Sequence, residues 1–170
     1  MIERIAVSPD GWLEWNGRRV RAALGRGGVT LSKREGDGGT PAGTFALRSL
    51  LYRADRLVQP VTLLDCAPIA EDSGWSDDPA DPAYNRPVRL PHAFGHERLW
   101  REDGVYDLIV PLGYNDAPPI AGRGSAIFLH VARPAYAPTE GCVALALNDL
   151  LLLLADCGPE TRLEISDGRR

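Results

Sequence analysis

Long hydrophobic runs and cysteines are both scarce in this sequence. The longest apolar run, residues 150–155, is far shorter than the roughly 20 residues that a membrane-spanning helix requires. Residues 1–9 contain no apolar core of the kind that marks a secretion signal, so we expect neither a membrane span nor a cleavable signal peptide. Because there are three cysteines, at least one thiol stays outside any intramolecular disulfide.

A strong excess of one charge is also absent. The 19 basic and 23 acidic side chains give a net charge of −4, and the basic ones are scattered along the chain, which argues against a nucleic-acid groove. Charged residues make up 25% of the 170 residues and hydrophobic ones 44%, as is typical of globular proteins. With no internal repeat or low-complexity linker, residues 1–170 are predicted to form one domain that needs no disulfide or metal to fold.

The amino-terminal part of the chain predicts a β-hairpin. Residues 2–7 alternate between apolar and polar types, and a second pair of short segments, 12–15 and 18–24, is separated by Asn16-Gly17. Both turn residues tolerate positive φ, and this dipeptide is the strongest short-range signal for a hairpin.

The centre of the chain predicts strands separated by long loops. A glycine-rich loop over residues 25–43 precedes a strand over 44–52, and residues 67–97, rich in Pro, Asp, Gly and Trp, are interpreted as one long structured loop. Residues 106–112 and 125–132 are strongly apolar, which predicts two central strands that are buried on both faces.

One helix is predicted near the carboxyl end. Asn148 is a candidate N-cap, Asp149 favours the positive end of the helix dipole, and residues 150–154 propagate the helix. Gly158-Pro159 ends it, and residues 161–165 predict a short closing strand. Many strands with one clear helix indicate a mainly β domain or a β-rich α+β domain.

Residues 125–147 place a histidine and a cysteine on either side of one loop. His130 ends a very apolar strand, and Cys142 directly follows the turn at 138–141. A returning chain can bring both side chains to one end of a sheet, where the imidazole takes the thiol proton and leaves a nucleophilic thiolate. Gly141 permits backbone conformations that other residues avoid, so the amides of residues 141 and 142 are candidates for an oxyanion hole.

A packing role is the alternative interpretation of these residues. Cysteine is among the most buried residue types, and a histidine at a strand end is commonly a hydrogen-bonded core residue. On spacing alone we favour packing for Cys142 and His130. Cys66 and Cys157 fit a packing role well, because neither has a nearby histidine or a glycine-preceded turn.

The sequence motifs around Cys142 favour a role as nucleophile over a packing role. His130, followed by a loop and then Thr139-Glu140-Gly141-Cys142, resembles the catalytic stretch of the L,D-transpeptidase family, also called YkuD-domain proteins. That family has a histidine at a strand end and then Ser/Thr-His-Gly-Cys. Residues 33–45, which contain Thr40-Pro41, are similar to the family's Thr-Pro-x-Gly-x-Phe motif. Residues 96–107 and 113–116 are similar to segments of a branch that lacks the second histidine, so the resemblance covers residues 30–165.

Two positions depart from the family pattern. Glu140 stands where most members have a histidine, and Ala144 replaces the usual Asn or Arg. An ionised carboxylate close to the thiol would raise the thiol pKa. We therefore expect Glu140 to be a solvated turn residue, with the binding of a cationic amine as the alternative.

The resemblance implies a mainly β fold, a β-sandwich with one or two short helices and long loops, and a two-step acyl transfer that needs no cofactor and no metal. Cys142 would attack a carbonyl at an L-centre of a peptidoglycan stem peptide, and His130 would take the thiol proton and protonate the leaving amine. The carbonyl of Val131 would orient the His130 ring, and the amides of Gly141 and Cys142 would hold the oxyanion.

The second step decides the product. An amine from another stem gives a 3→3 cross-link, a free D-residue gives exchange, and water makes the enzyme an L,D-carboxypeptidase. The expected partners are peptidoglycan stem peptides, with no nucleic acid and no membrane span, and a monomer is expected. The resemblance implies a periplasmic or cell-wall location, whereas the absence of a visible signal peptide leaves a cytoplasmic one open.

Four further side chains are candidates for substrate binding: Tyr114, Asn115, Thr139 and Arg133. Tyr114 and Asn115 follow the strand at 106–112, and Asn115 can bind a substrate amide or cap a turn. Arg133, like Arg86 and Arg123, can pair with a substrate carboxylate in bidentate fashion, although a surface role is open for each arginine.

Two rival functions remain at this point. His92 and His96 have the i, i+4 spacing of a helical zinc pair, but Pro91 and Gly95 disfavour a helix there. The second rival is an inactive wall-binding module that keeps the fold without turnover, an alternative that rests on Glu140 and on the absence of a signal peptide.

Overall fold

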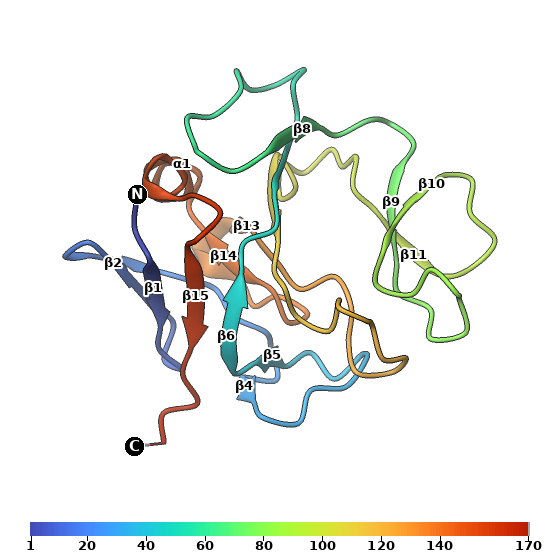
Figure 1. The fold of residues 1–170 in the computed structure, drawn as a ribbon, viewed down its shortest axis with the longest axis horizontal. Helices are drawn as coiled ribbons and strands as arrows, with labels where there is room; N and C mark the ends of the chain where they lie inside the picture. Colours follow the sequence, from blue (N-terminus) through green and yellow to red (C-terminus); the bar gives the residue numbers. More distant parts are fainter. Residues whose placement is uncertain (170) are drawn as a thin grey trace.

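The computed structural model describes residues 1–169 and contains two five-stranded sheets. The first has the strand order β3 (Arg18–Arg21), β2 (Trp12–Trp15), β1 (Arg4–Val7), β15 (Arg162–Ile165) and β6 (Gly43–Ala46). The second has the order β14 (Val143–Leu145), β13 (Phe128–Val131), β12 (Leu108–Pro111), β7 (Leu50–Tyr52) and β8 (Cys66–Pro68). Figure 1 shows β13 and β14 lying deep in the molecule, behind the first sheet in this view. The prediction of a mainly β fold is confirmed.

Two smaller sheets and two helical segments complete the fold. The three-stranded sheet has the order β10 (Pro87–Arg89), β9 (Ser73–Ser76) and β11 (His96–Arg98), and β4 (Val29–Thr30) pairs with β5 (Thr40–Pro41). The helix is α1 (Leu147–Asp156), and a 3-10 turn, η1 (Pro134–Tyr136), lies between β13 and β14.

The predicted hairpin is present with the predicted turn. Asn16 and Gly17 have φ values of 46° and 75°, as a type I′ turn requires, and Trp15 pairs with Arg18 across the hairpin. The predicted closing strand, β15, pairs in parallel with β1, with Ile5 opposite Leu163. The two ends of the chain thereby form the middle of one sheet.

Alternation of side chains along the second sheet separates two apolar clusters. Leu108, Val110 and Leu129 face the main core, whereas Ile109 and Phe128 face a second, smaller cluster. Because successive residues of a strand point to opposite faces, β12 and β13 are buried on both sides, which confirms the prediction of two central strands. The second cluster includes Cys142.

The prediction of one continuous strand over residues 44–52 is wrong. The chain forms β6 in the first sheet and β7 in the second, and Leu47 bridges to Leu112 between them. The break falls at polar residues, where Arg48 turns outward to pair with Asp116, at 2.8 Å. The apolar run thus passes from one sheet to the other, a crossover that only tertiary packing fixes.

The two segments predicted as loops contain short β-strands that were not predicted. Residues 25–43 hold β4 and β5, and residues 67–97 hold β9, β10 and β11. These short strands lack a clear alternation and depend on distant partners: the Trp75 ring packs edge-on against Phe128 at 5.1 Å, and its Nε1 donates to Oδ1 of Asn85 at 2.9 Å.

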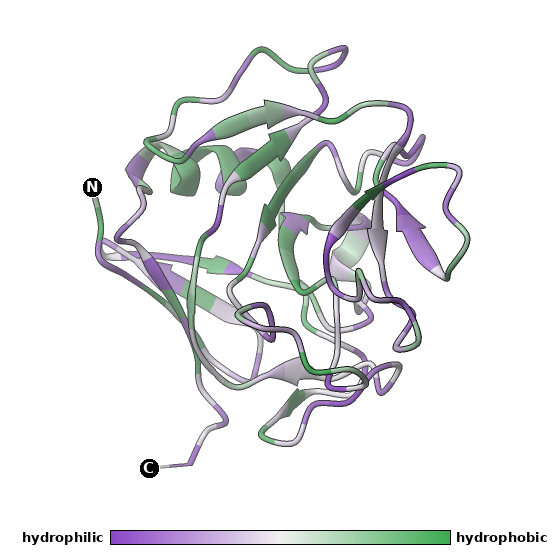
Figure 2. Ribbon diagram, turned by 45° about the vertical axis from the view of Figure 1, so that its right-hand side comes forward, coloured by the Kyte–Doolittle hydropathy of each residue, from purple (hydrophilic) through white to green (hydrophobic). Residues whose placement is uncertain are grey.

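The helix is longer at its start than predicted. Its N-cap is Ala146, which makes no side-chain cap, and Asn148 lies exposed inside the first turn rather than capping it. Asp149 occupies the first turn, as expected from the helix dipole. Leu150, Leu153 and Leu154 are buried in the main core, and Figure 2 shows the helix as a mostly hydrophobic element. Among residues 1–169, no helix has the length and apolar character needed to cross a membrane.

Candidate active site

A cavity of about 320 Å³ lies where the second sheet meets the loop at residues 33–37 and the three-stranded sheet. Its uncharged lining includes Cys142, His130, Tyr106, Val105 and Ala126. Its charged lining includes Lys33, Glu35, Asp77, Glu97, Arg101 and Arg133. The cavity therefore joins a thiol and an imidazole to charges of both signs.

Strand register brings the cysteine and the histidine together. In the parallel pairing of β13 with β14, Leu129 lies opposite Val143 and His130 lies opposite Ala144. Cys142 comes directly before Val143, so it lies on the same face as His130, one step diagonally across the strands. Both side chains line the same cavity.

The turn before Cys142 is fixed by its neighbours. Thr139 Oγ1 donates to the carbonyl of Cys142 at 2.7 Å and accepts the Gly141 amide at 3.1 Å. Gly141 has φ +138°, and a Cβ at this position would lie 2.7 Å from the carbonyl oxygen of Gly39. Both the backbone conformation and the space available therefore require glycine.

The hydrogen bond of the histidine determines which ring nitrogen is basic. His130 Nδ1 lies 2.8 Å from the carbonyl oxygen of Val131, as the resemblance implied. Since a carbonyl only accepts, Nδ1 carries the proton and Nε2 is left as the base. The Tyr106 ring lies edge-on to the imidazole at 5.3 Å, and burial lowers the pKa of His130 to about 4.

The cysteine is held as a neutral thiol. Its Sγ donates to the carbonyl of Ala126 at 3.2 Å and accepts the Phe128 amide at 3.3 Å. Burial raises the pKa of Cys142 to about 12, and the charge of Glu97 acts in the same direction. Thiol and imidazole are thus both uncharged at neutral pH, so a thiolate forms only when Sγ–H turns from Ala126 and His130 takes the proton.

Comparison with known proteins agrees with this geometry. The model of the L,D-transpeptidase catalytic domain, YkuD, matches residues 3–165. The chain belongs to the L,D-transpeptidase family. A search of curated proteins found no match.

Solved structures share the fold at low sequence identity. The helical cell shape determining protein Pgp2 from Campylobacter jejuni is 13% identical with a TM-score of 0.50, over 99% of this chain and 49% of that one. Mycobacterium tuberculosis L,D-transpeptidase 1 is 13% identical with a TM-score of 0.42, over 95% and 59%. LD transpeptidase LdtMt1 in complex with imipenem gives 13% and 0.42, over 96% and 58%. The chain thus spans between 49% and 59% of these proteins' lengths, and the likeness to Pgp2 shows the fold alone.

The other two cysteines of this family member lie outside the cavity. Cys157 is fully buried and its Sγ donates to the carbonyl of Leu153 at 3.1 Å, while Cys66 is half-buried in β8. All three thiols are free. Cys157 belongs to the main core and Cys66 packs against it, as predicted.

Two predicted substrate residues do not line the Cys142 cavity. Tyr114 and Asn115 line a neighbouring cavity together with Arg123, and the Tyr114 hydroxyl donates to the Arg123 carbonyl at 2.5 Å. Asn115 Nδ2 donates to the carbonyls of Ile120 and Gly124, at 3.0 and 2.9 Å. The side chain therefore closes its own loop, the turn-capping role that the sequence left open, rather than facing Cys142.

Arg133, Thr139 and Glu140 do line the cavity. Arg133 is exposed, and Thr139 uses its hydroxyl inside the turn. Glu140 is 75% exposed and pairs with Arg26 at 3.0 Å, so the expected solvated turn residue is a surface ion pair that contributes little stability. The remaining candidate arginine, Arg86, lines a separate cavity.

Sequence reasoning missed the role of the segment at residues 97–106 in shaping the cavity. Tyr106 is 7% exposed, and its hydroxyl donates to Oε2 of Glu97 at 2.5 Å. Both residues lie in the block similar to the family, which was the available signal, but only the fold shows that they reach Cys142 and His130.

The His92–His96 pair does not lie on a helix. Nε2 of His92 lies 2.6 Å from Oδ2 of Asp81, and Nδ1 of His96 lies 2.7 Å from the carbonyl of Phe94. Within the described part of the chain, no group of three or more His, Cys, Asp or Glu side chains is placed to hold a metal ion.

Proposed function

We propose that this chain is a cysteine-dependent acyltransferase that acts on peptidoglycan stem peptides and forms 3→3 cross-links or exchanges the terminal D-residue. The observation that carries the proposal is the pairing of Cys142 with His130 in one cavity, with Nδ1 of the histidine bonded to Val131. This bond leaves Nε2 as the base. Thr139-Glu140-Gly141-Cys142 would place the chain in the branch without the second histidine.

The first step acylates the cysteine. Nε2 of His130 takes the thiol proton, the Cys142 sulfur attacks the carbonyl at the L-centre, and the resulting imidazolium protonates the leaving amine. The Gly141 amide is bonded to Thr139, so the predicted pair of oxyanion donors reduces to the amide of Cys142. Burial of the thiol keeps it from reacting as a free thiolate before substrate arrives.

The second step transfers the acyl group. An amine attacks the thioester carbonyl, the bond to sulfur breaks, and His130 receives the proton of the amine and returns it to the thiolate. If water attacks instead, the same bond is hydrolysed and the enzyme is an L,D-carboxypeptidase. Binding of stem peptides without either step would make it an inactive wall-binding module.

Acylation by a carbapenem tests the nucleophile. We expect a mass adduct on the protein that disappears in Cys142→Ser and forms at least about 100-fold more slowly in His130→Ala, whereas Cys66→Ala and Cys157→Ala keep it. A folded protein without an adduct favours the binding module. Equal loss in all variants would mean that the substitutions act through stability and not through catalysis.

The products distinguish transfer from hydrolysis. Mass spectrometry of tetrapeptide muropeptides incubated with the protein is expected to show cross-linked or exchanged stems, whereas tripeptides alone would identify a carboxypeptidase. Gel filtration during purification tests the expected monomer.

The substrate sets the place of action. We propose a periplasmic or cell-wall location and a part in wall construction and cell shape. Fractionation of cells that make the native gene product is the test, and recovery with the cytoplasm would favour a role on recycled wall fragments.

A further inference from the structure

The carboxylates that line the Cys142 cavity differ in how they are bonded. Glu35 accepts two hydroxyl groups, from Tyr84 at 2.5 Å and from Ser125 at 2.8 Å. Glu97 accepts only the Tyr106 hydroxyl, at 2.5 Å, among residues 1–169. A carboxylate offers about four acceptor sites, so Glu97 keeps most of its capacity for another donor.

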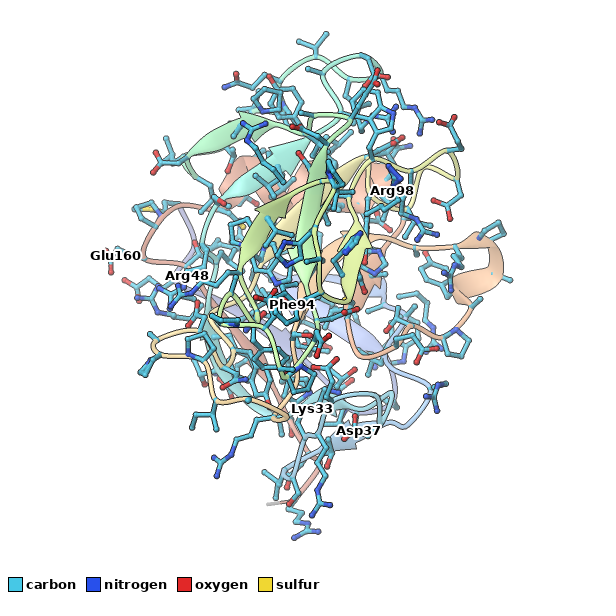
Figure 3. All side chains as sticks on the ribbon, turned by 90° about the vertical axis from the view of Figure 1, so that its right-hand side faces the viewer. Lys33, Asp37, Arg48, Phe94, Arg98 and Glu160 are labelled. Carbon is cyan, nitrogen blue, oxygen red and sulfur yellow. The ribbon has the colours of Figure 1, made fainter. Side chains whose placement is uncertain are left out.

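Among residues 1–169 the cations of the cavity form no ion pair with Glu97, although the charge of Arg101 acts to lower its pKa. Lys33 Nζ pairs with Asp37 at 2.6 Å, and Figure 3 shows these two residues next to each other in the lower part of the view. Arg101 pairs with Asp103 at 2.5 Å. In the described chain, neither Glu97 nor the nearby cavity residue Asp77 has a cationic side chain within 4.0 Å.

Glu97 also lies close enough to the reacting groups to influence them. Its charge contributes to the raised pKa of Cys142, and the tyrosine that holds it packs edge-on against the His130 ring at 5.3 Å. Burial and the charge of Asp77 raise the pKa of Glu97 itself. A positive group bound here would offset the negative charges of both Glu97 and Asp77.

We propose that Glu97, supported by Asp77, binds the ammonium group of the acyl acceptor and makes this site prefer amines to water. The inference rests on the proposed acyltransferase function and specifies its second substrate. Arg133 lines the same cavity, is exposed, and has no carboxylate within 4.0 Å among the described residues. An acceptor with an ammonium group next to a carboxylate, such as the D-centre of an amino acid, fits both charges.

Acyl transfer to the bound amine releases two protons from its nitrogen. The bound ammonium gives one proton to Glu97, and the neutral amine attacks the carbonyl carbon of the Cys142 thioester. The carbon–sulfur bond breaks and sulfur leaves with the electron pair. Nε2 of His130 takes the second proton from nitrogen and passes it to sulfur, and Glu97 releases its proton to solvent.

Partition of the thioester tests the inference. A stem tetrapeptide donor is incubated with increasing deuterium-labelled D-alanine, so that the exchanged product differs in mass from the donor. Mass spectrometry then gives the ratio of exchanged to hydrolysed product. This ratio depends on the second step and not on how fast the thioester forms. We expect Glu97→Gln to lower the ratio at least 10-fold at a fixed D-alanine concentration, and Asp77→Asn to lower it less.

The controls separate charge from general damage. Glu160→Gln changes an exposed carboxylate away from the cavity and is expected to keep the ratio of the unmodified protein. Arg133→Gln is expected to lower the ratio with D-alanine but not with D-alanine amide, which lacks the carboxylate. If Glu97→Gln does not fold, Asp77→Asn and Glu97→Asp, which keeps the charge, carry the test.

The outcomes separate this inference from the function on which it rests. If the unmodified protein forms no thioester at Cys142, the proposed function fails and the inference fails with it. If the thioester forms but the ratio is unchanged in Glu97→Gln and Asp77→Asn, the inference is overturned while the acyltransferase stands. A thioester that goes only to water in the unmodified protein also overturns it.

Discussion

Cys142, the proposed nucleophile, lies in surroundings that oppose its charged form. It is 7% exposed, and burial together with Glu97 holds its pKa at about 12, while burial holds the pKa of His130 at about 4. Each shift disfavours the ion pair of thiolate and imidazolium in the free protein. In the proposed mechanism, bound substrate would supply part of the stabilisation, through an oxyanion at the amide of Cys142 and an ammonium near Glu97.

The buried histidine makes stability depend on pH. The pKa of His130 is about 4 in the folded protein against about 6.5 in an unfolded chain, so the unfolded state binds the extra proton first. Protonation of His130 therefore leaves the free energy of unfolding unchanged above pH 6.5 and lowers it by about 3 kcal/mol as the pH falls toward 4. Urea unfolding at pH 7.5 and 4.5 is expected to show a loss about 2–3 kcal/mol smaller in His130→Gln than in the unmodified protein. His96→Gln is the control, and equal losses in all three proteins would contradict the prediction.

Gly141 combines a left-handed backbone with a crowded position. An added Cβ would meet the Gly39 carbonyl at 2.7 Å, whereas Gly122, with φ +81°, has no atom within 4 Å of such a Cβ. Gly122→Ala is therefore expected to cost about 1 kcal/mol, and Gly141→Ala about 3 kcal/mol. Because the turn carries Cys142, carbapenem acylation should fall about 100-fold in Gly141→Ala alone. Similar acylation rates in the two variants would contradict this role for the turn.

At the scale of elements, the site is produced by the unit of β13, its loop and β14. Parallel pairing puts His130 opposite Ala144 and leaves Cys142 at the point where the chain enters β14. The same alternation that sends Leu129 into the main core turns His130 and Phe128 to the other face. A shift of register by one residue would send the histidine into the core, so core packing also holds His130 and Cys142 in position.

The start of α1 has no side-chain cap and can be improved. Ala146 occupies the N-cap position with φ −55° and ψ 144°, a conformation in which a serine hydroxyl accepts an amide of the first turn. Ala146→Ser is expected to raise the free energy of unfolding by about 0.5–1 kcal/mol, measured by chemical denaturation. Asn148→Ala, at the position that the sequence favoured as the cap, should change it by less than about 0.5 kcal/mol. The reverse ranking would mean that Asn148 is the cap.

At the scale of the whole molecule, the cavity depends on contacts between distant segments. β9 and β11 belong to a separate small sheet, yet Asp77, which directly follows β9, and Glu97, in the middle of β11, line the cavity. Trp75 of β9 packs on Phe128 of the second sheet. The loop at residues 33–37 reaches the same cavity. The lining of the cavity thus comes from segments that only the complete fold brings together.

One buried arginine ties β7 to the segment that carries Arg101. Arg53 forms two hydrogen bonds to Asp55 at 2.8 Å, donates to the Arg101 carbonyl at 2.6 Å, and stacks over Trp100 at 3.5 Å. Lysine cannot reproduce this planar set of donors, so Arg53→Lys is expected to cost about 2–3 kcal/mol. The Arg89 side chain, which pairs with Asp72, is 82% exposed. Arg89→Lys should therefore lower the free energy of unfolding by less than about 0.5 kcal/mol. Equal costs measured by urea unfolding would contradict the structural role of Arg53.

Features that depend on local chemistry were predictable from the amino-acid sequence. Asn16-Gly17 predicted the hairpin because both residues accept positive φ, and the apolar runs predicted the central strands. The motif from Thr139 to Cys142, with His130 before it, indicated the family, because a nucleophile, its base and a glycine turn lie within one short segment.

The packing of the sheets fixed the features that depend on distant partners. It divided residues 44–52 between two sheets, built a sheet in residues 67–97, and placed Asn115 in its own loop. It also brought Glu97 beside the cavity of Cys142. Propensity and alternation are local, whereas the pKa of a thiol and the charges that face it are set by burial and by side chains from other elements, and these exist only once the sheets have packed.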